Sequence, residues 1–320
     1  MNTKAAAIAN NGLVTVRNFL VKNWFFGAML LVLIFGLQFP FLGGSIKPFT
    51  KPLIFSAMFV MGIRQDFSSF LSSIKDFKAI LFCLASSFIL MPLLGYAVGK
   101  LFFSTDFLMF TGVMISSAVS TTMVSAIVWT SITKGNESLA MVLSIITSIA
   151  CVFAAPFILY VSLKATIAIP VGKMIKDLFV IIIFPVIISQ IIRHYLRMDY
   201  GKLSKASKIL GQVIILSVIM MATSTPTGFG YMVIVSVLGA AVLQYLAISI
   251  FSYNVSKLFT SKSNAVAIMY CSSQKALSTA ALISMTYFDP ATSIYVLVYH
   301  IFQQIMGQVT TKILVNEADA

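Results

Sequence analysis

Residues 261–287, SKSNAVAIMYCSSQKALSTAALISMTY, decide how this chain is built. Two apolar halves enclose a polar segment, Cys-Ser-Ser-Gln-Lys, in which Lys275 stands near the centre. At ~1.5 Å per helical residue the stretch is long enough to cross a bilayer. A lysine at that depth costs at least ~2.5 kcal/mol unless it faces protein, water or an anion. The stretch therefore predicts an interrupted membrane helix rather than a uniformly apolar one.

The composition is typical of a helical membrane protein. Hydrophobic residues make up 59% of the 320 residues, charged residues make up 10%, and the mean hydropathy is +0.99. Apolar runs of about 20 residues favour helices over a β-barrel, whose strands alternate. Lys and Arg number 22 against 9 Asp and Glu, an excess that we assign to cytoplasmic loops rather than to a nucleic-acid partner. Cys83, Cys151 and Cys271 have no metal-binding spacing and predict free thiols.

The apolar runs predict ten membrane-spanning helices in two halves of five. A segment at 1–23 and a tail at 316–320 flank the halves, 24–163 and 164–315, which divide near a long basic connection. Because each half has an odd number of helices, the second inserts upside down, and the fold class is an all-α inverted repeat. The predicted helices are 24–41, 52–63, 77–102, 107–132, 138–163, 175–192, 209–222, 231–253, 264–287 and 291–315.

Charge placement orients the predicted helices. If both termini lie in the cytoplasm, most of the Lys and Arg residues fall in inner segments, as the positive-inside rule requires. All 9 acidic residues fall in or beside loops, so Lys275 is the one formal charge predicted at mid-bilayer. We therefore expect an integral, multi-pass protein of the bacterial inner membrane with both termini in the cytoplasm. The outer segments then hold Lys47, Lys51, Lys100, Lys164, Lys173 and Lys176.

When the two halves are overlaid, the fourth helix matches the ninth, and both are interrupted. The fourth helix has the small polar string SSAVSTT at residues 116–122 between two apolar runs. Paired interrupted helices in an inverted repeat point to the binding site of a transporter. Unwound backbone supplies free N–H and C=O groups there, and Ser and Thr hydroxyls add donors and acceptors.

These two segments resemble those of the bile acid:sodium symporter family, and more closely its SBF-like branch. The branch pattern TTVxSSIAFTSIARGN corresponds to TTMVSAIVWTSITKGN at residues 121–136, and Gly-Ser-Lys-Lys-x-Leu corresponds to SSQKAL at 272–277. The resemblance covers nearly the whole chain. It implies ten helices in two inverted repeats, with the broken fourth and ninth helices crossing near the midplane in a core domain. It also implies a panel domain that moves against the core to alternate access.

The chain departs from the sodium-coupled members of that family at their cation ligands. Their Ser-Asn pair in the fourth helix falls on Ala126 and Ile127. Two further ligands of those members, a Ser and a Thr in the fifth helix, fall on Ala140 and Ser144. Only one hydroxyl therefore remains among these four positions, and the resemblance predicts that the first sodium site is mostly lost.

The ninth helix departs in the same direction. The Glu of the family motif falls on Tyr270, the Gln is kept as Gln274, and the Asn becomes Lys275. A hard cation prefers oxygen ligands, a carboxylate among them, and a fixed lysine repels Na⁺. We therefore expect no resident metal and no cofactor, with sodium coupling doubtful and proton coupling left open.

Lys275 is open to three functional roles. It is a tethered cation in place of sodium, a group that binds and releases a proton because burial disfavours its charged form, or a direct partner of an anionic substrate. The structural alternative is that the amine only hydrogen-bonds unwound carbonyls where the fourth and ninth helices cross. Because the one interior charge is positive, we expect a small organic anion as substrate.

The predicted substrate and coupling site gathers polar residues from the fourth, fifth, ninth and tenth helices. His300 shares a helix face with both Gln303 and Gln304, at spacings of three and four residues. Packing by small side chains, or hydrogen bonds to neighbouring helices, is the alternative interpretation for these residues. The full set is Thr121, Thr122, Ser125, Thr130, Ser144, Tyr270, Ser272, Ser273, Gln274, Lys275, His300, Gln303 and Gln304.

The sequence favours a secondary transporter over the other functional classes. The sequence has no HExxH motif, phosphate-binding loop or dinucleotide-binding glycine pattern, and no interior acid, which argues against an enzyme. A non-transporting accessory or regulatory membrane protein on the same fold is the main alternative. A cation/proton-antiporter-like or sodium-coupled transporter is a further one. The expected partners are the organic anion and the lipid bilayer; a homo-oligomer is left open.

Overall fold

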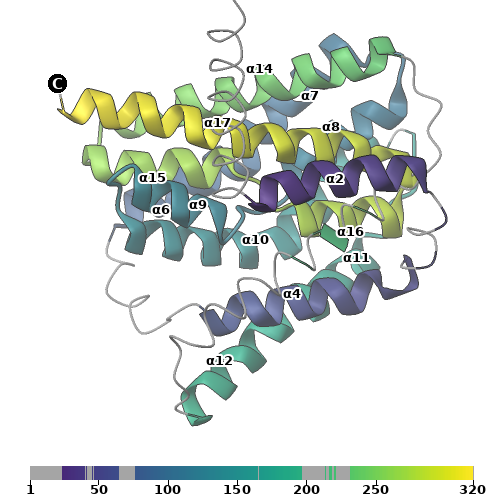
Figure 1. Cartoon of the computed structure of the whole chain (residues 1–320), viewed down its shortest axis with the longest axis horizontal. Coiled ribbons are helices and arrows are strands. Elements are labelled where there is room, and N and C mark those ends of the chain that lie inside the picture. The colour runs from purple at the N-terminus through teal and green to yellow at the C-terminus, as the bar shows by residue number, and fades with distance from the viewer. Residues whose placement is uncertain are drawn as a thin grey trace, which may run out of the picture.

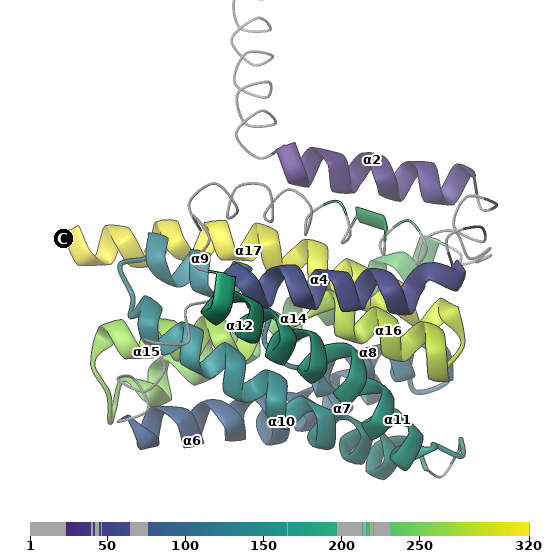
Figure 2. The same ribbon diagram turned by 90° about the horizontal axis from the view of Figure 1, so that it is seen from below.

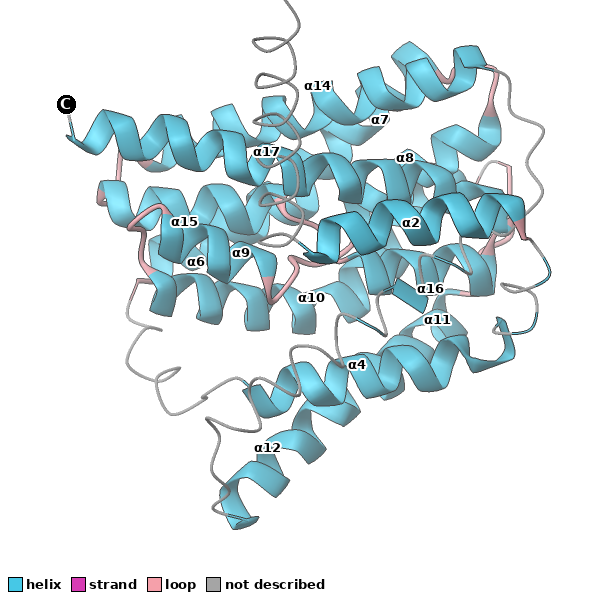
Figure 3. Cartoon of the chain, in the orientation of Figure 1, coloured by secondary structure: helices cyan, strands magenta, loops and turns pink. Residues whose placement is uncertain are grey.

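The computed structural model describes residues 24–39, 41, 45, 47–64, 76–164, 166–196, 213, 216, 217, 220 and 231–319. Within these ranges every regular element is a helix, as Figure 3 shows. The α-helices are α2 (Trp24–Gln38), α4 (Thr50–Arg64), α6 (Phe77–Ala85), α7 (Met91–Phe102), α8 (Phe107–Ala118), α9 (Ser125–Ile132), α10 (Glu137–Leu163), α11 (Val171–Leu178), α12 (Phe184–Leu196), α14 (Tyr231–Ser256), α15 (Lys262–Ser273), α16 (Leu277–Tyr287) and α17 (Ser293–Asp319).

In the described part of the chain, four helices are long and apolar enough to cross a membrane: Phe77–Phe102, Glu137–Leu163, Val171–Tyr195 and Met232–Ser256. They confirm the predicted class, an all-helical membrane protein. The first is α6 and α7 joined by the π-helical turn Ser86–Leu90, and the third is α11 and α12 joined by a second π-helical turn. The predicted helix at 209–222 lies almost wholly outside the described residues, so the count of ten helices stays a prediction.

Short polar residues begin several of the helices. Asp76 caps α6, Asp106 caps α8, Asn136 caps α10 and Ser261 caps α15, each accepting a hydrogen bond from a first-turn N–H. These N–H groups have no partner inside the helix, so a side-chain oxygen at this position stabilises the helix start. The two aspartates thus serve at helix ends, as their predicted place in or beside loops requires.

The helices run roughly along one long axis and form two unequal parts (Figures 1 and 2). Helices α4 and α12 pack side by side at one edge of the molecule, and α11 continues into α12 through its π-helical turn. We call α4, α11 and α12 the small layer. Helices α6 to α10 and α14 to α17 pack together as the main bundle. The two parts meet where α4 contacts α16 and where α11 contacts α10.

The main bundle has two apolar clusters that meet at the polar crossing. One cluster contains buried residues of α8 and α16, such as Val113 and Ala281. The other contains buried residues of α9 and α15, such as Ala126 and Ile268. Because α8 leads into α9 and α15 leads into α16, the segments that connect each pair pass from one cluster to the other. Both connections therefore lie inside the bundle, at the boundary between the clusters.

Candidate functional site

Both interruptions predicted from the sequence are present. Helix α8 ends at Ala118 and α9 begins at Ser125, while α15 ends at Ser273 and α16 begins at Leu277. Val119, Gln274 and Ala276 are extended, and the two breaks meet as a short antiparallel pair in which Thr121 lies opposite Lys275. Four helix ends therefore converge at one point in the interior of the bundle.

The two breaks satisfy one another's backbone groups. The N–H of Thr122 donates to the carbonyl of Gln274 at 2.9 Å, and the N–H of Ala276 donates to the carbonyl of Ser120 at 2.9 Å. The hydroxyl of Thr121 donates to the carbonyl of Cys271, which belongs to the last turn of α15. Unpaired backbone groups are costly in an apolar interior, so these bonds explain how unwound chain persists there.

Gln303 of α17 completes the backbone pairing on the other side of Lys275. Its Oε1 accepts from the Lys275 N–H at 2.7 Å, and its Nε2 donates to the Lys275 carbonyl at 2.9 Å. In an extended chain the N–H and C=O of one residue point to the same side. The side-chain amide of Gln303 pairs with both groups of Lys275, as a residue of a neighbouring strand would. Gln303 is fully buried, and its contacts hold the crossing together.

The ammonium group of Lys275 lies in the interior of the main bundle, and only 2% of the residue is exposed. Its Nζ donates to the carbonyls of Ser87 at 3.3 Å and Val119 at 3.2 Å, and lies 5.9 Å from the centre of the Phe88 ring. Among the described residues no carboxylate is paired with it. A buried cation held only by neutral groups keeps most of its desolvation penalty.

Gln274 ties the break of the ninth helix to three other helices. Its Nε2 donates to the carbonyl of Gln303 at 2.9 Å and to the hydroxyl of Tyr245, on α14, at 3.2 Å. Its Oε1 accepts from the hydroxyl of Ser125, the first residue of α9, at 3.2 Å. Gln274 is fully buried, so its predicted place at the crossing is matched by a complete set of partners.

The ring of His300 is oriented by the same glutamine that pairs with Lys275. Gln303 Nε2 lies 2.8 Å from His300 Nδ1. The Lys275 N–H can only donate, so it must face the Gln303 oxygen, and the amide nitrogen is left to face His300. Nδ1 of the neutral ring is therefore the acceptor and Nε2 carries the proton. In the described structure this buried Nε2 has no hydrogen-bond partner.

A small cavity lies where the crossing meets the small layer, and we call it the polar cavity after the Ser, Thr and His residues in its otherwise apolar lining. Its volume is about 30 Å³, which is room for one or two water molecules. Ser278, Thr279 and His300 line it on the main-bundle side, together with residues 120–123, and Met58 and Ile182 line it from the small layer. An apolar cavity of about 290 Å³ shares Met123, Ser148 and Ile182 with it and continues along α12.

The N-terminus of α16 also faces the polar cavity, because Leu277, Ser278 and Thr279 are among its lining residues. The N-cap residue, Ala276, makes no side-chain hydrogen bond to this helix end. The first-turn N–H groups of a helix have no intrahelical acceptors and carry a partial positive charge. The cavity therefore combines hydroxyl groups, one imidazole N–H and one positive helix end.

Three predicted hydroxyls bond back to their own helices. Thr130 donates to the carbonyl of Ala126, Ser144 to that of Ala140, and Ser273 to that of Met269. Such back-bonding is common for Ser and Thr inside helices.

The remaining predicted residues lie beside the crossing, and none of them lines the polar cavity. Ser272 is fully buried next to the Cys83 thiol. The Tyr270 hydroxyl lies 2.9 Å from Thr311, and Gln304 accepts from Trp129 Nε1 at 3.4 Å. The structure thus brings together Thr121, Thr122, Ser125, Gln274, Lys275, His300 and Gln303 at the crossing and its cavity.

Several residues of the site had no distinct signal in the sequence. Ser87 supplies its carbonyl from a π-helical turn. Such turns are frequent at functional sites, but the composition and periodicity of the sequence did not predict this one. Tyr245 and Tyr299 bond to the break of the ninth helix from α14 and α17. Ser278 and Thr279 follow the polar segment after Ala276 and Leu277, so their position at the start of α16 could have indicated them.

Two discontinuous helices that cross at a polar interior site are typical of secondary transporters. The chain belongs to the SBF-like CPA transporter family, whose model matches residues 23–318. This confirms the predicted branch of the bile acid:sodium symporter family, and the family is one of transporters.

Named relatives agree with this assignment. "Sodium/bile acid cotransporter 7" of Danio rerio is 22% identical over 309 residues, which cover 90% of this chain and 92% of the relative. "Uncharacterized protein YbaS" of Bacillus subtilis is 21% identical over 80% of this chain and 85% of its own. "Probable sodium/metabolite cotransporter BASS4, chloroplastic" of Oryza sativa subsp. indica is 25% identical over 59% of this chain and 45% of its own.

Proposed function

We propose that the protein is a secondary active transporter that moves a small organic anion by alternating access. The single observation that carries the proposal is the buried ammonium of Lys275, which has only carbonyl partners at the crossing of the two broken helices. A membrane protein that keeps such a charge in its interior uses it for a substrate or an ion pathway by default. The relatives named as cotransporters of sodium with a bile acid or metabolite support the same class of activity.

The polar cavity supports a negatively charged substrate group. The N–H on Nε2 of His300 lacks a partner, the first-turn N–H groups of α16 have no intrahelical acceptor, and a carboxylate oxygen accepts from both kinds of donor. In the described part of the chain, Lys275 is the one buried residue with a formal charge. A cation would meet the same donors and the same positive charge, which disfavours it.

Sodium does not fit the residues at the crossing. The carbonyls of Ser87 and Val119, which are oxygen ligands of the kind that a hard cation prefers, already accept hydrogen bonds from Lys275. The Tyr270 hydroxyl, at the position of the family's Glu, is engaged with Thr311. We propose that the sodium sites are eroded and that the ammonium of Lys275 stands in for the ion or carries a proton.

The two roles of Lys275 are separated by one substitution. An arginine stays charged at every accessible pH, whereas a buried lysine can lose its proton. If the amine is a tethered cation, Lys275→Arg keeps uptake at a reduced rate; if it carries a proton, the variant loses uptake driven by a pH gradient. Uptake by Lys275→Gln that equals the wild type in rate and pH dependence, at equal expression, would refute both roles.

Alternating access requires the small layer to move away from the main bundle. The polar cavity of about 30 Å³ admits a water or two, but no organic anion of several heavy atoms. Its far wall is Met58 of α4 and Ile182 of the π-helical turn before α12. In this proposal the small layer belongs to the panel domain and the main bundle is the core of a ten-helix inverted repeat in the bacterial inner membrane, with both termini in the cytoplasm.

The test is a thermal-shift screen of the purified protein against organic acids over a range of pH, with and without Na⁺. We expect at least one acid to raise the melting temperature without any need for Na⁺. His300→Gln, which keeps an N–H near the position of Nε2, should retain that stabilisation, and His300→Phe should lose it. Stabilisation that appears only with Na⁺ would contradict the eroded sodium sites.

A non-transporting accessory or regulatory protein on the same fold is the second candidate. It is favoured only by the complete hydrogen bonding of Gln274 and Gln303, which would suit a static crossing. Flux of a stabilising acid into proteoliposomes separates the two candidates. Binding without flux, in protein that is shown to be folded, would favour the accessory role.

A further inference from the structure

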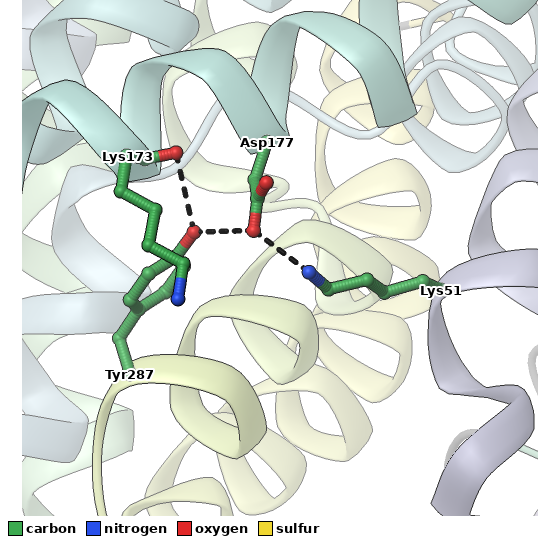
Figure 4. Close-up of polar contacts among 4 residues, drawn as sticks. All are labelled: Lys51, Lys173, Asp177 and Tyr287. Atoms are coloured by element: carbon green, nitrogen blue, oxygen red, sulfur yellow. Dashed lines mark hydrogen bonds and ion pairs between the residues drawn. The ribbon is translucent and has the colours of Figure 1, made fainter.

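A polar cluster lies at the end of α16 that is farther from the crossing (Figure 4). Asp177 of α11 accepts from Lys51 Nζ, on α4, at 2.8 Å and from the Tyr287 hydroxyl, on α16, at 2.7 Å. The same hydroxyl lies 3.4 Å from the carbonyl of Lys173. We call Lys51, Asp177 and Tyr287 the α16-end cluster. It shares no residue with the candidate site at the crossing.

The α16-end cluster joins the two parts of the molecule. Lys51 and Asp177 both belong to the small layer, so their bond fixes α4 against α11. Tyr287 belongs to the main bundle, so its bonds to Asp177 and to the Lys173 carbonyl both cross between the parts. The other end of α16, at Leu277 to Thr279, lines the polar cavity. The Tyr287–Asp177 bond therefore lies at the end of α16 that is opposite to that cavity.

A cavity lies at the opposite end of the small layer, whereas the α16-end cluster joins this end to the main bundle. Gln190 and Ile191, near the C-terminus of α12, line the apolar cavity of about 290 Å³. Asp177 lies at the other end of the same continuous helix, Val171–Tyr195. At one end of their interface, the small layer and the main bundle are thus joined by the α16-end cluster. At the other end, the apolar cavity lies between them.

We propose that the hydrogen bond between Tyr287 and Asp177 is a gate, which closes the entrance at this end of the interface and opens in each transport cycle. Lys51 is the positioning residue that holds Asp177 toward Tyr287. With both termini in the cytoplasm, the gate closes the outer entrance. This inference rests on the proposed alternating access, in which the small layer moves against the main bundle.

The exposure of the cluster suits a contact that breaks and re-forms. The side chains of Lys51 and Asp177 are 48% and 20% exposed, so water can replace their partners when the layers part. The Tyr287 ring is half-buried and stays with α16. The buried contacts of Gln303 differ in this respect, because no water reaches the groups that would be left unpaired.

The experiment measures access to the cavity and needs no substrate. A Ser278→Cys reporter lines the polar cavity, and a membrane-impermeant anionic methanethiosulfonate is added outside intact cells. The three native cysteines are buried, and labelling of protein without the reporter is subtracted. We expect Tyr287→Phe to raise the labelling rate severalfold, with a smaller rise for Asp177→Asn, which keeps an acceptor oxygen. Tyr160→Phe, at an exposed tyrosine of α10, is the matched control and should not change the rate.

An unchanged labelling rate in Tyr287→Phe would overturn the gate. If that variant does not reach the membrane, Asp177→Ala decides instead, because it removes the shorter of the two bonds of the Tyr287 hydroxyl and leaves Tyr287 in place. An equal rise in the Tyr160→Phe control would also overturn it, since the effect would not belong to the cluster. A rise in labelling in a protein that transports no acid would refute the proposed substrate and leave the gate standing.

Discussion

The crossing and the α16-end cluster are both polar, but they differ in burial and in the kind of group that they pair. At the crossing, backbone N–H and C=O groups pair with each other and with the fully buried Gln303. At the α16-end cluster, side chains pair with side chains, and the Lys51–Asp177 bond is open to water. Breaking a bond at the crossing leaves a buried polar group without a hydrogen-bond partner. Breaking a bond at the α16-end cluster leaves groups that water can reach.

This difference separates the parts of the molecule that must stay fixed from those that can move. A site that recognises a substrate has to keep its geometry while the entrances on either side of it open and close. The crossing has the bonding of a fixed element, and the α16-end cluster has that of a contact between moving elements. The substitutions below test this division, from the largest expected effect to the smallest.

Gln303→Leu should damage the crossing most. The change removes both hydrogen bonds to the Lys275 backbone and leaves a buried N–H and a buried C=O, at a cost of about 2–6 kcal/mol. Thermal unfolding in detergent should show a large drop in melting temperature. Gln304→Leu, on the next residue, loses one long bond to Trp129 and is the control. Equal drops for the two variants would mean that the crossing is not a rigid unit.

Lys275→Met should keep or raise stability while it abolishes stabilisation by an organic acid. The methionine has a similar shape, and replacing a buried charge by a packed apolar group is often neutral or stabilising by about 1–4 kcal/mol. Melting temperatures measured with and without the acid test both effects. A clear loss of stability would instead show that the bonds to Ser87 and Val119 make the ammonium a structural group.

Asp76→Ala should have an intermediate effect at the end of the main bundle. Asp76 caps α6 and also accepts from Asn264 Nδ2 at 2.6 Å, and Asn264 in turn accepts from Asn136. Loss of the cap and of the charged hydrogen bond should cost about 2–3 kcal/mol. Asp106→Ala, which removes only the cap of α8, should cost about 1 kcal/mol and is the comparison. The reverse order in melting temperature would contradict the link between α6, α10 and α15.

Lys51→Gln should have the smallest effect on stability. The pair with Asp177 is partly exposed, and such pairs contribute at most about 1 kcal/mol. The melting temperature should change little, and less still at high salt, which screens the pair in the wild type. A large drop in melting temperature that does not depend on salt would show that the α16-end cluster is a fixed contact like the crossing. That result would contradict the division between fixed and moving contacts.

The sequence predicted the two breaks because their cause is local. The string at 116–122 and the polar segment around Lys275 cannot continue as uniformly apolar membrane helices, and both interruptions lie where this composition changes. The same reasoning predicted that Lys275 faces protein, water or an anion, because a charge exposed to lipid at that depth is costly. The helix starts at Asp106 and Asn136 likewise follow from single capping residues.

The roles of individual site residues could not be predicted in this way. Gln303 and Gln304 are adjacent and identical in type, yet one holds the Lys275 backbone and the other contacts Trp129. The rotation of α17 decides between them, and that rotation depends on packing against α8, α14 and α16. The predicted shared face of His300 with both glutamines was consistent with either outcome.

By itself the sequence determined the membrane class, the family and the two interrupted helices, because composition, motif and buried charge act over a few neighbouring residues. Only the tertiary structure decided that Ser87 supplies a carbonyl to Lys275, that Gln303 orients His300, and that Tyr287 meets Asp177. These contacts join residues far apart in the chain, and they exist only when the helices have settled their rotation and depth against one another.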